Sequence, residues 1–127
     1  MPAEISSAFL VKSSGERVQD PFAPRVQVEL QFQATEPGEG HPDHWLVGAD
    51  VTVRSADASA EQYRGSSLFA VGLGAGDPPS PPALVAQFWP HIRADLTAQC
   101  SRIAGQTLSL PFELTVEQLT SALEQNT

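Results

Sequence analysis

The apolar residues of this chain change their spacing once, from every second position before residue 74 to every third or fourth position after residue 83. A period of two is typical of a strand with one buried face, and a period near 3.6 is typical of a helix. The segment GLGAGDPPSPP separates the two halves, and its prolines and glycines disfavour both a strand ladder and a helix. The pattern therefore predicts an α+β domain in which the sheet comes first and the helices follow.

Four strands are predicted before this break. Residues 26–34 and 45–54 alternate between apolar and polar side chains, and the loop EPGEGHPDH between them suits an antiparallel pair. Residues 63–73 alternate on one face, whereas their other face is only half polar, and residues 8–18 form a more irregular strand. We expect these segments to form a four-stranded antiparallel meander sheet.

The second half predicts a long helix, an extended crossover segment and a short C-terminal helix. Ser and Pro at residues 80–81 match an N-cap with proline at the first helical position, and Gly105 is a stop signal. Pro90 lies inside this helix, which must either kink or restart there. The segment TLSLPFEL is expected to be extended, and residues 115–118 offer a capping box to the short helix. The apolar stripe of the long helix consists of Leu84, Val85, Phe88, Trp89, Ile92, Leu96, Cys100 and Ile103.

The composition limits the size and the partners of this fold. A chain of 127 residues, 41% of them hydrophobic, suffices for a single domain over residues 1–127 with an ordinary core. Seven Lys and Arg against 15 Asp and Glu give a net charge of −8, which disfavours nucleic acid as a partner. The start of the chain lacks the pattern of a signal peptide, no run is long enough for membrane insertion, and the single cysteine forms no internal disulfide. We expect a cytoplasmic protein.

No group of residues predicts an enzyme, a metal site or a cofactor. His41 and His44 form an H-x-x-H pair, but zinc needs three or four ligands, and we favour solvated loop histidines. Cys100 lies on the apolar stripe, so we favour a small buried hydrophobe over a nucleophile. Glu29 and Asp50 point to the polar faces of their strands and form a candidate acidic face for a partner, with a solubilising role as the alternative.

The second half holds more apolar and aromatic residues than one sheet face and one helix can obviously bury. Two compatible explanations stay open, a subunit interface and a groove for apolar polypeptide. If the surplus forms a groove for polypeptide, we predict that this client-binding groove is lined by Phe88, Trp89, Leu110, Phe112, Leu114, Leu119 and Leu123.

Part of the sequence resembles the SecB export chaperones and their SecB-like relatives. FWPHIR at residues 88–93 stands where that family has an aromatic-Pro-aromatic-x-Arg-Glu pattern at the start of its long helix. SR at residues 101–102, Gly105 and LSLP at residues 108–111 stand where the family has Ser-Arg, a glycine-containing turn and a Leu-x-Leu-x-Pro segment. Ala94 replaces the acidic residue that follows the arginine, which indicates a divergent member.

The resemblance implies a homotetramer, a dimer of dimers, in which long helices lie between the sheets of paired dimers. It also implies an ATP-independent holdase chaperone for unfolded polypeptides, acting in protein folding and protein transport. The client is a preprotein for export or an antitoxin, and the export motor SecA is a further partner of the family.

A second hypothesis is a structural or assembly protein that reuses this fold without enzymatic activity and whose apolar surface serves only oligomerisation. Under either hypothesis, Arg93 and Arg102 are expected to donate hydrogen bonds to helix or loop carbonyls, and Pro90 to shape the start of the long helix.

Overall fold

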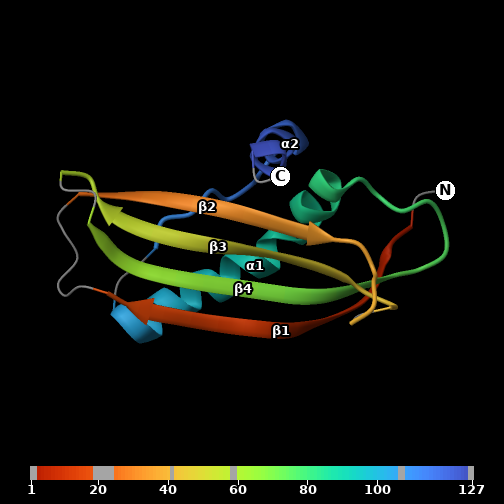
Figure 1. The fold of residues 1–127 in the computed structure, drawn as a ribbon, viewed down its shortest axis with the longest axis horizontal. Coiled ribbons are helices and arrows are strands. Elements are labelled where there is room, and N and C mark those ends of the chain that lie inside the picture. Colours follow the sequence, from red (N-terminus) through yellow and green to blue (C-terminus); the bar gives the residue numbers. More distant parts are fainter. Residues whose placement is uncertain (1–2, 19–24, 41, 58–59, 106–107, 126–127) are drawn as a thin grey trace.

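A four-stranded antiparallel sheet carries the long helix on one of its faces, and the short helix lies beside the long one near one edge of the sheet (Figure 1). The structure is a computed structural model, which describes residues 3–18, 25–40, 42–57, 60–105 and 108–125. Its elements are the strands β1 (Ile5–Arg17), β2 (Val26–Thr35), β3 (Trp45–Ser55) and β4 (Glu61–Leu73) and the helices α1 (Pro81–Ala104) and α2 (Val116–Gln125). The predicted α+β class and the predicted order of elements are confirmed.

The strands are ordered β1-β4-β3-β2 across the sheet, and every neighbouring pair is antiparallel. Strands β2, β3 and β4 follow one another as the predicted meander, whereas β1 lies beside β4, which completes a Greek-key order. The reason is burial: most residues of β4 are buried or half-buried, which suits a central strand, and most residues of β1 are exposed, which suits an edge. The half-apolar outer face of residues 63–73 is the sequence signal for this central place.

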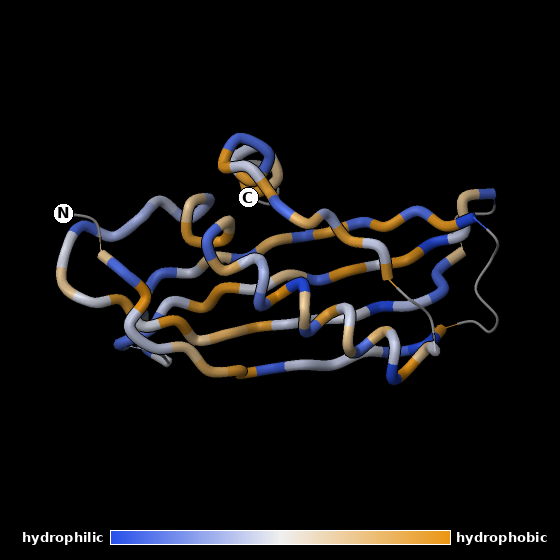
Figure 2. Tube along the Cα trace, turned by 180° about the vertical axis from the view of Figure 1, so that it is seen from behind, coloured by the Kyte–Doolittle hydropathy of each residue, from blue (hydrophilic) through white to orange (hydrophobic). Residues whose placement is uncertain are grey.

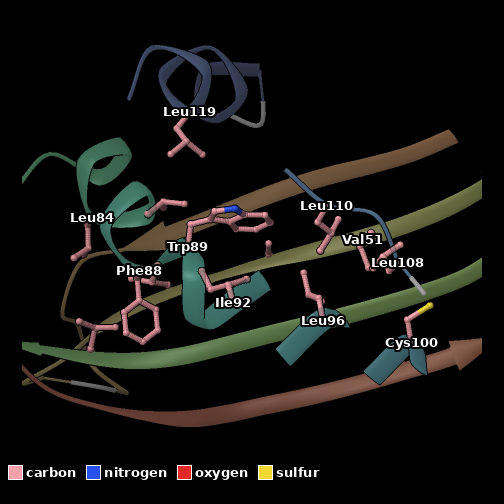
Figure 3. Packing of buried hydrophobic residues seen from close by; sticks show 14 of the residues in the cluster. Val51, Leu84, Phe88, Trp89, Ile92, Leu96, Cys100, Leu108, Leu110 and Leu119 are labelled. Carbon is pink, nitrogen blue, oxygen red and sulfur yellow. The ribbon is translucent and has the colours of Figure 1, made fainter. Parts of the chain in front are cut away.

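The core lies between the inner face of the sheet and α1. Apolar and polar residues alternate along β2 and β3, so one face of each of these strands turns towards the helix (Figure 2). The most deeply buried members of the core include Val51, Leu84, Ile92 and Leu96 (Figure 3), and Val47 and Val53 are buried with them. Burying one such side chain contributes about 1.5–3 kcal/mol, so this layer holds α1 on the sheet.

Both ends of α1 are capped as the sequence predicts. The Ala83 N–H donates to the Ser80 side-chain oxygen at 3.3 Å. Gly105 has a φ of 68°, a left-handed conformation that favours glycine, and its N–H donates to the Ser101 carbonyl at 3.1 Å. Pro90 lies inside one continuous helix, so α1 does not restart there.

The glycine- and proline-rich segment between β4 and α1 is held by residues near the start of the chain. The Ala3 N–H donates to the Asp77 carbonyl, and the Gly74 N–H donates to the Glu4 carbonyl, both at 2.8 Å. Gly76 adopts a φ of 129°, which side chains rarely allow. These backbone bonds fix the entry of the chain into α1.

Candidate functional site

The crossover segment, residues 108–115, is anchored on α1 by Trp89. The indole Nε1–H donates to the Pro111 carbonyl at 2.9 Å, and the indole packs edge-to-face on Phe32 of β2, with ring centroids 5.8 Å apart. Because Trp89 is buried and makes both contacts, it fixes the backbone of the segment at Pro111. The next side chain, Phe112, is 77% exposed.

The helix α2 is set at the end of this segment by the predicted capping box. The Gln118 N–H donates to Thr115 Oγ1 at 3.1 Å, and the Thr115 N–H donates to Gln118 Oε1 at 3.0 Å. Leu119 is fully buried and points from α2 towards the layer that contains Trp89 (Figure 3). The segment and α2 thus form one surface with α1, which we call the crossover surface and define as the exposed parts of residues 86–93, 111–116 and 120–123.

The seven predicted groove residues fall into two groups. Phe88, Trp89, Leu110 and Leu119 are buried in the core cluster. Phe112 is exposed, and Leu114 and Leu123 are half-buried. Phe88 packs edge-to-face on Phe69 of β4, with ring centroids 5.0 Å apart. Four of the seven therefore support the crossover surface from beneath or beside it, and three lie at its surface.

A cleft of about 240 Å³ opens beside the exposed phenylalanine. It is lined by Ala86, Trp89, Pro90, Phe112, Glu113 and Leu114. Five of these six residues have apolar side chains and the sixth is a glutamate, which suits an uncharged side chain of a polypeptide better than a charged small molecule.

Arg93 does not make the predicted hydrogen bond to a helix or loop carbonyl. Its Nε is buried without a partner, and its Cζ lies 5.3 Å from the centroid of the Phe112 ring. The guanidinium therefore stacks on an aromatic ring in place of donating to the backbone.

A second exposed apolar surface lies on the edge strand β1, and sequence reasoning did not single it out. Phe9, Leu10 and Val11 are 55%, 47% and 49% exposed. The pairing with β4 shifts between Leu10 and Lys12, so Val11 stands outside the register. Three consecutive apolar residues place apolar side chains on both faces of a strand. This run in the sequence could have indicated an exposed apolar surface on β1.

The outer face of the sheet carries Glu29 and Asp50, and its charges are mixed. Glu29 Oε1 lies 3.3 Å from Arg54 Nε, and Arg54 Nη2 lies 3.4 Å from Glu61 Oε1. Asp50 is exposed and lies across from Gln31 in the register of β2 and β3. Of these two candidate carboxylates, Glu29 is paired with an arginine, and Asp50 is the one without an ion pair among the described residues.

A buried polar cluster ties β1 to α1. The Gln99 side chain is fully buried, and its Nε2 lies within donor distance of Ser13 Oγ at 2.6 Å, the Ser66 carbonyl at 2.8 Å and Asp95 Oδ2 at 3.0 Å. The Tyr63 hydroxyl donates to Gln99 Oε1 at 3.3 Å. Burial raises the pKa of Tyr63 to about 12, so the phenol stays protonated as a donor near neutral pH.

The remaining candidates for chemistry are Cys100 and the two loop histidines. Cys100 is fully buried and burial raises the pKa of its thiol, which confirms its interpretation as a buried hydrophobe. His41 lies outside the described residues, and the His44 ring packs edge-to-face on Phe9, with centroids 5.3 Å apart. Within the described ranges, no three or more His, Cys, Asp or Glu are grouped to hold a metal ion, and no helix is both long and apolar enough to cross a membrane.

Fold and site together define an α+β domain in which a long helix covers a Greek-key sheet and an anchored crossover segment presents an aromatic side chain. A solved structure with this architecture is the SecB-like chaperone Rv1957 of Mycobacterium tuberculosis, in complex with a ChAD peptide from the HigA1 antitoxin Rv1956. The two chains superpose with a TM-score of 0.67 and 16% identity, over 89% of this chain and 91% of the other. The protein has the SecB-like fold, and the resemblance of its sequence is confirmed at that level.

Comparisons of sequence alone find no such relationship. No protein-family model matches the chain, and no curated protein matches it either.

Proposed function

We propose that this protein is an ATP-independent holdase chaperone that binds unfolded polypeptide at the crossover surface. The observation that carries the proposal is Phe112, an aromatic side chain that is 77% exposed although the residues around it are anchored. An aromatic ring held in water in this way is typical of a binding surface. The likeness to a chaperone solved with an antitoxin peptide supports the same class of protein.

The seven predicted residues take different parts in this proposal. Phe112, Leu114 and Leu123 contact the client, whose apolar side chains enter the cleft beside Phe112. Phe88, Trp89, Leu110 and Leu119 keep that surface in place from the core. Burial of apolar area contributes about 25 cal/mol per Å², so binding needs no nucleotide and no catalytic residue. The net charge of −8 helps to keep the complex in solution.

The partners follow the same reasoning. We propose a cytoplasmic, non-enzymatic protein whose client is a preprotein for export or an antitoxin. A partner such as SecA would bind the outer sheet face through a basic surface, because Asp50 is exposed there, whereas Glu29 is already paired with Arg54.

We further propose a homo-oligomer, a dimer of dimers, with β1 as a contact between copies. An edge strand exposes unpaired backbone N–H and C=O groups, and β1 adds three exposed apolar side chains to them. The competing proposal is an assembly protein in which such contacts are the whole function. It predicts no affinity for unfolded chains.

The deciding experiment is an aggregation assay without ATP. A chemically unfolded polypeptide is diluted into buffer with a molar excess of the purified protein or of an equally acidic inert protein, and light scattering is followed. We expect suppressed scattering only with this protein. Unchanged aggregation would favour the assembly protein.

A further inference from the structure

Arg93 lies at the crossover surface with its hydrogen-bonding capacity unused. Its Nε is buried without a partner, and no carboxylate within the described ranges forms an ion pair with it. Arg54 and Arg64, by contrast, are paired with glutamates on the outer sheet face. Arg93 is half-buried, and Nε alone among its nitrogens is buried and unpartnered, so its terminal Nη groups are open to solvent.

A second buried donor without a partner lies one helical turn further along α1. The Thr97 hydroxyl has no hydrogen bond, and residues four apart share a helix face. A buried donor that lacks an acceptor is unfavourable, and most such groups in proteins are satisfied. Arg93 and Thr97 share one face of α1, and Arg93 lies beside the exposed Phe112 ring. Two unpartnered donors on one face are the arrangement expected where a ligand supplies the acceptors.

The surroundings indicate which acceptor this is. Glu113 lines the cleft beside Phe112, and the net charge of the chain is −8, and both disfavour a carboxylate as the ligand. A main-chain carbonyl carries no net charge, and every residue of an extended polypeptide offers one. A guanidinium offers five N–H donors in a fixed plane and accepts nothing, which matches such an oxygen.

We infer that Arg93 is the hydrogen-bond donor of the client site. Its guanidinium binds a main-chain carbonyl of an extended polypeptide whose apolar side chain lies against Phe112, which the same guanidinium stacks on. This inference rests on the proposed function and adds how a client is oriented: the ring selects an apolar side chain, and Arg93 fixes the backbone beside it without reading the sequence.

The test measures the dissociation constants of two labelled peptides by fluorescence anisotropy. Both are extended segments with the same leucines, and they differ only in carrying Glu or Gln beside each leucine. We expect Arg93→Met to weaken both peptides about tenfold, the effect of losing a hydrogen bond to a charged donor. Arg93→Lys should lie between, because lysine keeps the charge and loses the planar fork. The matched control is Arg102→Met, the same change at an exposed residue of α1, which should stay within about twofold of the wild type.

Each outcome decides the inference. Unchanged affinity in Arg93→Met overturns it and leaves the holdase proposal standing, as does an equal loss in Arg102→Met. If Arg93→Met lowers the affinity of the Glu peptide alone, Arg93 binds the glutamate carboxylate, and a main-chain carbonyl is overturned as its ligand. Absence of binding by the wild type overturns the proposed function and this inference together. Circular dichroism checks folding, and if Arg93→Met is unfolded, Arg93→Lys decides by the same criteria.

Discussion

At the scale of residues, Phe112 and Gln99 show opposite ways in which a side chain departs from the apolar pattern. Phe112 is apolar and exposed, because Trp89 holds the backbone at Pro111 and leaves the next side chain outside. Gln99 is polar and fully buried, because acceptors from two strands and from its own helix surround its amide. The first arrangement serves a surface, and the second fixes the packing of β1 on α1.

Phe112→Glu should abolish most client binding while leaving the fold intact. Full burial of a phenylalanine contributes about 1.5–3 kcal/mol, so we expect affinity to fall at least tenfold. An exposed side chain contributes little to folding, and the thermal midpoint should therefore move only slightly. Peptide anisotropy and circular dichroism measure the two effects, and Phe112→Leu, which keeps an apolar group, is the control. Unfolding of Phe112→Glu would mean that Phe112 belongs to the core.

Gln99→Leu should destabilise the protein by about 2–3 kcal/mol in urea unfolding, because the buried Tyr63 hydroxyl loses its acceptor and Ser13 loses a donor. Thr97→Val is the matched control on the same helix, since the Thr97 hydroxyl has no hydrogen bond to lose in the free protein. Equal losses in the two variants would contradict the role of the Gln99 cluster.

The raised pKa of Tyr63 predicts a loss of stability at high pH. The folded pKa of about 12 lies above the unfolded value near 10, so the contribution of the neutral phenol is complete below pH 10. It should disappear as the pH rises from 10 towards 12. Urea unfolding of the wild type and of Tyr63→Phe over this range measures the difference, and an identical decline in both would contradict it.

At the scale of elements, what the sequence could predict was local. The capping box at residues 115–118 and the caps of α1 follow from neighbouring residues, and all are present. The place of β1 beside β4 depends on contacts between distant segments, which the alternation of residues 8–18 does not specify. The contact of Arg93 with Phe112 could not be predicted for a similar reason, because the ring comes from the crossover segment and the spacing along α1 does not specify it.

The capping box should control the stability of α2. Thr115→Ala removes the oxygen that accepts from the Gln118 N–H, which costs about 1 kcal/mol. We expect faster amide hydrogen exchange in α2 and unchanged exchange in α1. Thr120→Ala is the control, because its hydroxyl bonds only to the Val116 carbonyl within the helix. Faster exchange throughout α1 would show that α2 does not open separately.

At the scale of the whole molecule, one exposed apolar surface lies on β1, with Phe9, Leu10 and Val11, and another lies over α1 and α2, with Phe112 and Val116. If β1 joins copies of the chain while the crossover surface binds clients, one can be changed without the other. Leu10→Lys places a charge on the exposed edge, where lysine opposes strand pairing. We therefore expect a lower mass by light scattering, with peptide affinity per chain within a few fold of the wild type. A monomeric wild type would contradict the oligomer, and loss of peptide binding in Leu10→Lys would mean that the client site is completed across the interface between copies.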